Sequence, residues 1–366
     1  MPVRKSPQPL QPAGDSRYTR TMPTSSRRRL ASPPIVGARP IELRVRGDFV
    51  EWLAASGGTL AVTTYNSGKL ALFSAPDGTL TASYWSLPRP MGMAVSGNQL
   101  AVATRDLLWQ MEIAANDAAA EANQLITPRQ VDATGRLDAH DLAFDRRGLL
   151  FANTRFNCVA RPSERASFKR TWQPPFMADA ATNTAVDCCH LNGIGVREGR
   201  LAMATAFCER SEPAAWRAGD RFASGVLLDV RQNRVAVRGL SMPHSPRWHD
   251  GQWWLCDSGR GALATVHLGR EIFEPVIELP GMTRGLTFVG DRAVVGLSRI
   301  RKRHILDAPP VRERWPRLRS GVAVVDYARG VETGSLEFVR GGREVYDAAF
   351  LPGVTAATFP TEAVGA

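Results

Sequence analysis

Residues 138–144 read DAHDLAF, in which a histidine and an aspartate are followed at once by a short apolar run. Two altered copies of this stretch occur further along the chain, HLNGIGV from His190 and HSPRW from His244. Looser copies are MGMAV from Met91, TRGLTF from Thr283 and YDAAF from Tyr346, and neighbouring copies lie 49, 50, 54, 39 and 63 residues apart. A unit of short strands that repeats near this period is typical of a β-propeller or a solenoid.

Turn residues separate the apolar runs around these copies. From residue 49 the runs FVEWLAAS, TLAVTTY, KLALFSA and LTASYWSL follow one another, with Asn66-Ser67-Gly68 and Pro76-Asp77-Gly78 among the separators. Asn, Asp and Gly supply the positive φ that a tight reversal needs, so we expect four antiparallel strands, which make one propeller blade. Later units repeat this pattern, and EVYDAAFLP near the C-terminus is left as a lone first strand that would help to close the ring.

The sequence therefore predicts an all-β protein with a single β-propeller over residues 41–353. Six blades are favoured, and seven are the alternative. Residues 1–38 are rich in Pro, Ser and Arg and lack periodicity, so we expect a disordered basic arm there. Residues 354–366 are expected to form a C-terminal tail.

The net charge of +11 is concentrated in two segments. Residues 1–40 carry eight Lys or Arg and one acid, and residues 299–320 carry eight and two, so the rest is close to neutral. This distribution favours no extended phosphate-binding face, and no nucleic acid partner is expected. The five cysteines are an odd number without a CxxC pair, which does not support a disulfide framework. No 18-residue apolar run and no secretory signal is found, so a cytoplasmic protein without membrane contact is expected.

Three histidines occupy one position of the repeat. In a propeller the first strand of each blade lines the central channel, so His140, His190 and His244 are predicted to meet at one channel mouth. Neutral imidazole is a ligand for zinc, iron and copper, and this arrangement would suit such a metal site. Alternatively, each ring bonds backbone at a blade seam or lines a wet channel.

Other polar residues are predicted to reach the same face. The turns between second and third strands carry Asn-Thr-Arg and Asp-Ser-Gly, and arginines that could clamp a carboxylate or phosphate lie on or near the first strands. The candidate ligand-binding residues are Asn153, Arg155, Asn192, Arg247, Asp257, Ser258 and Arg284. Each arginine could equally form a salt bridge between blades. Two long insertions, 209–224 and 299–320, would lie on this face as lids.

The motifs together resemble an uncharacterised bacterial family of conserved hypothetical propeller-like proteins. The strings that carry the resemblance are HDLAF (140–144), NTRFNC (153–158), WQPPF (172–176), CHLNG (189–193), GVLLDV (225–230), GLSMPHSPRW (239–248) and LPGMTRGLTFVGD (279–291). They cover about residues 90–353, and they imply a fold without an established activity. A more distant likeness is to the calcium-dependent lactonase propellers, through Glu51 and Asn192-Gly193. That reading is disfavoured because His244-Ser245-Pro246 stands where the lactonases have an aspartate.

Two functions follow as hypotheses. The first is binding of a small polar molecule at the His-bearing face, with or without a transition metal and with or without catalysis. The second is a non-catalytic platform that holds a protein partner through the same face or the basic 299–320 loop.

Overall fold

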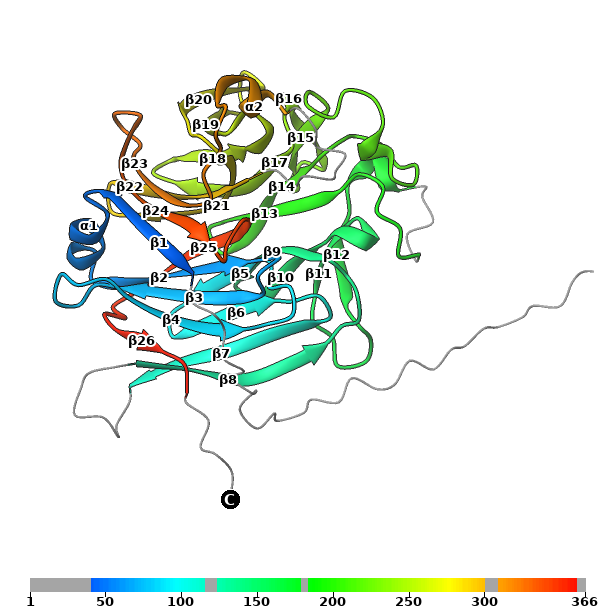
Figure 1. The fold of residues 1–366 in the computed structure, drawn as a ribbon. Coiled ribbons are helices and arrows are strands. Elements are labelled where there is room, and N and C mark those ends of the chain that lie inside the picture. Colours follow the sequence, from blue (N-terminus) through cyan, green and yellow to red (C-terminus); the bar gives the residue numbers. More distant parts are fainter. Residues whose placement is uncertain (1–40, 116–123, 179–183, 300–308, 361–366) are drawn as a thin grey trace, which may run out of the picture.

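The described chain forms six small sheets arranged as the blades of a β-propeller, and their strands pair antiparallel except for β26 (Ala357–Thr358) with β8 (Gln124–Ala133) (Figure 1). The coordinates are a computed structural model that describes residues 41–115, 124–178, 184–299 and 309–360. The all-β prediction and the count of six blades are confirmed, and the seven-blade alternative is wrong. The predicted arm, residues 1–38, lies outside the described residues, as does the 300–308 part of the basic loop.

We number the blades in chain order and give their strands from the channel outward. Blade 1 is β25 (Val345–Pro352), β2 (Gly58–Thr64), β3 (Lys69–Ser74) and β4 (Thr81–Ser86). Blade 2 is β5 (Met93–Ser96), β6 (Gln99–Ala103), β7 (Leu107–Ala115), β8 (Gln124–Ala133) and β26 (Ala357–Thr358). Blade 3 is β9 (Ala139–Asp145), β10 (Gly148–Asn153), β11 (Cys158–Arg161) and β12 (Lys169–Trp172).

The second half of the ring repeats this order. Blade 4 is β13 (Leu191–Arg197), β14 (Arg200–Ala206), β15 (Gly225–Asp229) and β16 (Arg234–Leu240). Blade 5 is β17 (Pro243–His249), β18 (Gln252–Asp257), β19 (Ala262–His267) and β20 (Ile272–Glu278). Blade 6 is β21 (Met282–Val289), β22 (Arg292–Ser298), β23 (Gly321–Asp326), β24 (Val331–Arg340) and β1 (Glu42–Gly47).

Strands from the two ends of the described chain close the ring. The C-terminal β25 is the inner strand of blade 1 and pairs along β2, while the N-terminal β1 is the outer strand of blade 6 and pairs with β24. The lone first strand of the sequence analysis therefore has the ring-closing place expected of it. Part of the expected tail also belongs to the fold, because β26 pairs with β8 and Phe359 is buried.

One run expected to be a strand is a helix. Residues Phe49–Ala55 form α1, on the connection from β1 to β2. Phe49 and Leu53 are both buried, and their spacing of four places them on one face of a helix. A short apolar stretch of this kind has no decisive period, so its sequence is compatible with a strand or a helix.

Hydrogen bonds from backbone N–H groups to side chains join neighbouring blades along the channel. Asp347 of β25 accepts from the Met93 backbone N–H of blade 2 at 2.7 Å, and Asp141 of β9 accepts from Ile194 N–H of blade 4 at 3.0 Å. The Ser245 hydroxyl of β17 accepts from a backbone N–H of β21 in blade 6 in the same way. In each case the side chain that accepts the hydrogen bond belongs to the second residue of a repeat copy. The repeat therefore specifies contacts between blades as well as the strands themselves.

The described chain contains no helix with the length and apolar character needed to cross a membrane.

Candidate functional site

A cavity of about 310 Å³ lies at the end of the channel where the first strands begin. Every blade supplies one residue to its wall at the start of a repeat copy: Tyr346, Met91, His140, His190, His244 and Thr283. Because all first strands run in the same direction along the channel, the equivalent positions meet at one end. The three histidines therefore share a cavity, as their common register predicts.

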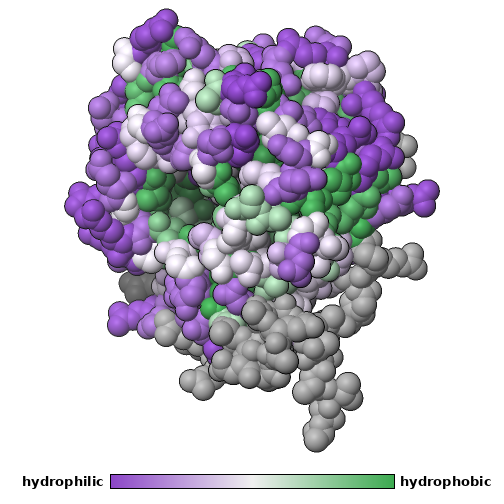
Figure 2. Space-filling view, turned by 90° about the vertical axis from the view of Figure 1, so that its left-hand side faces the viewer, coloured by the Kyte–Doolittle hydropathy of each residue, from purple (hydrophilic) through white to green (hydrophobic). Residues whose placement is uncertain are grey.

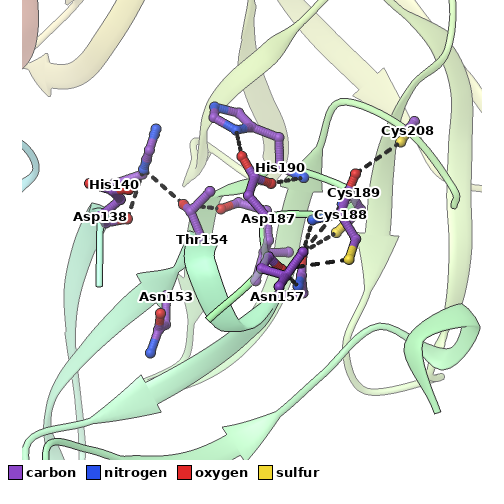
Figure 3. A network of polar contacts seen from close by, with 12 residues as sticks. Asp138, His140, Asn153, Thr154, Asn157, Asp187, Cys188, Cys189, His190 and Cys208 are labelled. Carbon is purple, nitrogen blue, oxygen red and sulfur yellow. Dashed lines mark hydrogen bonds and ion pairs between the residues drawn. The ribbon is translucent and has the colours of Figure 1, made fainter. Parts of the chain in front are cut away.

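His140 is oriented by the turn that follows β10. Thr154, in the 3-10 turn η1 (Thr154–Phe156), donates its hydroxyl proton to the Leu191 carbonyl at 2.5 Å. The same hydroxyl lies 2.8 Å from His140 Nδ1, so it can only accept from this nitrogen. The Asp138 carbonyl, also 2.8 Å from Nδ1, is a second acceptor (Figure 3). His140 therefore carries a proton on Nδ1.

His190 is held by an acidic neighbour. Asp187 accepts the His190 backbone N–H at 2.9 Å and faces Nδ1 at 2.7 Å (Figure 3). His190 itself has φ 54°, a left-handed conformation that is rare for a side chain of this size and is found where surrounding contacts enforce it. Asn157 enforces it here, because its side-chain oxygen accepts the backbone N–H groups of Cys188 and Cys189 just before the histidine.

The cysteines beside this turn are structural. Cys188, Cys189 and Cys208 are buried free thiols, and burial raises the pKa of Cys208 to about 11. A neutral, buried thiol is a poor nucleophile and a poor metal ligand. These residues therefore pack behind the cavity wall.

His244 is the most deeply buried of the three histidines. Its Nδ1 lies 2.7 Å from the Ser258 hydroxyl, which donates its own proton to the Thr283 carbonyl at 2.5 Å. Ser258 can therefore only accept from Nδ1. Burial first, and then the positive charge of Arg284, hold the pKa of His244 well below its usual range. The ring is neutral, with its proton on Nδ1 and a lone pair on Nε2.

Aromatic side chains fill the space between the imidazoles. The ring centroid of Phe207 is 4.5 Å from that of His190 and 5.3 Å from that of His244. The ring of Trp216, in the 3-10 turn η3 (Ala215–Arg217), packs against His190 in a tilted arrangement, with 4.4 Å between the ring centroids. This turn belongs to the 209–224 insertion, which therefore contributes to the cavity wall on the face where it was expected.

The imidazoles share the cavity but do not form a set of three metal ligands. The rings of His140 and His190 are 4.7 Å apart by centroid, in an edge-to-face arrangement, and Phe207 lies against the rings of His190 and His244. Within the described ranges, no group of three or more His, Cys, Asp or Glu side chains is placed to hold an ion.

Three of the predicted ligand-binding residues are part of the framework around the cavity. Asn153 is fully buried and caps η1 by accepting the Phe156 N–H, and Figure 3 shows its side chain apart from the histidine rings. Arg155 donates to the Ala185 carbonyl and thereby holds the segment that leads to His190. The buried Asn192 accepts from a threonine hydroxyl of the adjacent strand. None of the three lines the cavity.

Two more predicted residues serve the fold. Asp257 is buried in an ion pair with Arg260 at 2.6 Å. Arg247 lies further along the channel, where it forms a forked ion pair with Asp141, both bonds being 3.0 Å long. The alternative of a salt bridge between blades therefore describes Arg247. Ser258 and Arg284 do line the cavity.

The opposite end of the channel is hollowed as well. Figure 2 views the side of the molecule that carries α1 and shows a hollow with apolar residues in its wall. Residues from the far ends of the inner strands line a pocket, among them Leu142, Phe144, Ile194 and Leu286, with Arg247. The Arg247–Asp141 pair therefore lies between two openings of the channel.

The lactonase likeness is not supported by the positions of its residues. Glu51 lies on the exposed side of α1 instead of on a first strand, and Asn192 is engaged by Thr205. Neither residue is among those that line the cavity. The two residues that carried the likeness are therefore not brought together in it.

Several cavity residues were missed in the sequence. Tyr346 and Met91 begin repeat copies, so the same register that selected the histidines could have found them. Trp216, Arg217 and Phe207 lie in or beside an insertion without periodicity, and no sequence signal identifies them.

Comparison with known proteins gives a family but no activity. Among curated proteins, none matches this chain. A chain in the crystal structure of a nidogen/laminin complex is similar at 11% identity and a TM-score of 0.48, over 81% of this chain and 98% of that one. A protein of unknown function from Bacteroides caccae is similar at 8% identity and 0.39, over 80% and 98%. The computationally designed Ika8 protein is similar at 11% and 0.35, over 78% and 76%.

A family described as "Domain of unknown function (DUF4915)" matches residues 47–359. This range runs from the end of β1 to just beyond β26 and so includes nearly the whole propeller. The chain belongs to this family.

Proposed function

We propose that the protein binds a small polar molecule in the His-bearing cavity. The observation that carries the proposal is the common orientation of the three imidazoles. In each ring Nδ1 is bonded to an acceptor of the framework: the Asp138 carbonyl and Thr154, Asp187, or Ser258. Fixing one ring nitrogen in this way is how proteins present the other nitrogen to a ligand.

In two of the rings, Nε2 is available to a ligand in the cavity. In the part of the chain that the structure describes, Nε2 of His190 and of His244 has no hydrogen-bond partner. Neither nitrogen is among the fully buried atoms without a partner, so both are accessible from the cavity that the two residues line. A ligand in the cavity could therefore form hydrogen bonds with both rings.

A metal ion held by the three histidines is a narrower form of the same proposal. It requires the rings to move, because no three-ligand group exists in the present arrangement of the described residues. Elemental analysis of protein purified without a His tag measures it directly. Stoichiometric zinc, iron or copper that is lost in a His140→Ala variant would support this form.

We also propose a cytoplasmic location and a reduced state for the protein. All five cysteines are buried free thiols, which is the ordinary condition of cysteine in reducing compartments.

The test is ligand-observed NMR with a panel of amino acids, hydroxy acids, sugars and sugar acids. The key variant is His190→Asn, because an asparagine amide can still donate to Asp187 from near the Nδ1 position but has no group at the Nε2 position. Its matched control is His267→Asn, which removes a half-exposed histidine that pairs with Glu274 outside the cavity.

We expect at least one class of compound to bind the wild-type protein, His190→Asn to weaken it at least tenfold, and His267→Asn to leave it unchanged. Circular dichroism should be the same for all three proteins. A panel without any binding, or equal binding to His190→Asn, would overturn the proposal and favour the protein-interaction platform.

A further inference from the structure

Four residues that line the cavity each carry a buried donor without a partner among the described residues: Trp216 Nε1, Arg299 Nε, Arg284 Nη2 and the Tyr346 hydroxyl. The last two lie on neighbouring inner strands. Tyr346 of β25 is 3% exposed, and its hydroxyl forms no hydrogen bond with any described residue. The same is true of Nη2 of Arg284, on the neighbouring inner strand β21. Buried polar groups are bonded in the great majority of cases, so two orphan donors at one cavity wall call for an external acceptor.

The two donors form one unit. The guanidinium carbon of Arg284 lies 3.3 Å from the centre of the Tyr346 ring. Burial raises the pKa of Tyr346 far above its usual value, so the phenol keeps its proton and remains a donor. A guanidinium beside a phenol matches the two oxygens of a carboxylate.

The charge balance of the cavity also favours an anion at this point. Arg136 and Arg299 both line the cavity and have acidic neighbours, Asp138 at 3.7 Å and Glu337 at 3.6 Å. Arg284 has no ion pair with any residue that the structure describes, and neither has Arg217, the fourth arginine of the lining, which lies over the Trp216 ring. A partly buried cation without a counterion is costly, and a bound anion would supply the counterion.

The adjacent blade presents the reverse chemistry to the cavity. Nε2 of the neutral His244 is an acceptor, so it needs a ligand that donates. Arg284 and His244 both line this cavity, so a single ligand can contact the cation and the imidazole. The ligand must therefore carry both an anionic group and hydroxyl or similar donors.

The size of the cavity restricts the ligand further. A volume of about 310 Å³ equals that of about ten water molecules at roughly 30 Å³ each, which is enough for one sugar ring. Met91, Met242, Met282, Phe207 and Trp216 add apolar surface for the carbon skeleton.

We propose that the ligand is a hydroxylated carboxylic acid of the size of a sugar acid, with its carboxylate on Arg284 and Tyr346 and its hydroxyls on the imidazoles of His190 and His244. This inference rests on the proposed function and specifies the ligand class for the same cavity.

Isothermal titration calorimetry with matched probes tests the class. The acids are D-glucuronate, D-galacturonate and D-gluconate, D-glucose is the neutral counterpart, and cyclohexanecarboxylate is an acid without hydroxyls. We expect at least one sugar acid to bind at least tenfold more tightly than both comparison compounds. Binding of glucose as tightly as the acids, or failure of all three acids, would overturn the proposal.

Two variants test the residues. Tyr346→Phe removes only the orphan hydroxyl, so it should leave the melting temperature unchanged or raise it, while affinity for the sugar acid falls. Arg284→Gln should lower affinity at least tenfold, Arg284→Lys should lower it less, and the exposed Arg200→Gln is the control. Unchanged affinity in both Tyr346→Phe and Arg284→Gln would refute the assignment.

The two proposals fail in different ways. If the sugar acids fail but a neutral compound of the wider panel binds and His190→Asn weakens it, the ligand class is wrong and the cavity is still a binding site. If nothing binds at all, both proposals are wrong.

Discussion

Replacing Arg247 with methionine should strongly destabilise the propeller. The guanidinium forms two 3.0 Å bonds with the Asp141 carboxylate and also donates to the carbonyls of Pro246, Ile194 and Leu286. These contacts connect the inner strands of blades 3, 4, 5 and 6 through one side chain. Removal of one partner of such a buried pair typically costs about 3–5 kcal/mol, because the other charge stays buried and uncompensated.

In the Arg247→Met variant, Asp141 would be the buried charge without a counterion. It is 4% accessible, and among the described residues it would keep the Ile194 N–H as its one bonding partner. We therefore expect Arg247→Met to reduce the free energy of unfolding by about 3–5 kcal/mol. The double variant Arg247→Met/Asp141→Asn should lose less than Arg247→Met alone, because asparagine can still accept from Ile194 but carries no charge.

Urea unfolding followed by the fluorescence of the nine tryptophans measures these differences. The control is Arg129→Met, which breaks an exposed pair with Glu112 in which the arginine is 60% accessible and which should cost only about 0.2–1 kcal/mol. A loss below about 1 kcal/mol for Arg247→Met would refute the reasoning. So would a double variant whose loss equals the sum of the two single losses.

Two further predictions concern the ring. Burial, followed by the charge of Asp141, raises the pKa of Asp347 from 3.8 to about 7, so the folded state retains a proton that the unfolded state has lost. The stability that this proton contributes is complete below pH 4 and is lost as the pH rises toward 7. Asp347→Asn should flatten that decline in urea midpoints measured from pH 4.5 to 8, and identical slopes would contradict the assignment. Ending the chain at residue 340 removes β25 and should abolish cooperative unfolding, whereas removal of 361–366 should leave it intact; a cooperative transition in the shorter chain would show that the ring closes without its inner strand.

The sequence alone was sufficient for the propeller and for the position of its cavity. The repeat copies that begin at His140, His190 and His244 each mark the start of a first strand, and so they also indicate the end of the channel where these residues lie. Because side chains alternate between the two faces of a strand, the common register places the three histidines on the same side. For the same reason Met91, Thr283 and Tyr346 could be placed with the histidines, although the chemistry of Tyr346 was overlooked. Local patterns of this kind remain readable because they act within one strand and its turn.

Helix α1 and the roles of the polar residues depended on tertiary contacts. FVEWLAAS is compatible with a strand or a helix until Phe49 and Leu53 find a common surface against which to pack. Asn153, Asn192 and Asp257 looked like ligand contacts, but each meets a backbone or side-chain partner that is invisible in the linear chain.

Two arginines on first strands show this dependence most clearly, because one forms an ion pair within the fold and the other lines the cavity. Arg247 forms an ion pair with Asp141, 106 residues away in the chain. Arg284 lies over the Tyr346 ring, and its Nη2 has no hydrogen-bond partner among the described residues. Nothing in the local sequence around either arginine distinguishes them. The periodicity of the sequence determines the number and the register of the strands. Whether an arginine has a counterion depends on tertiary structure, because the closed ring decides which side chain lies opposite it.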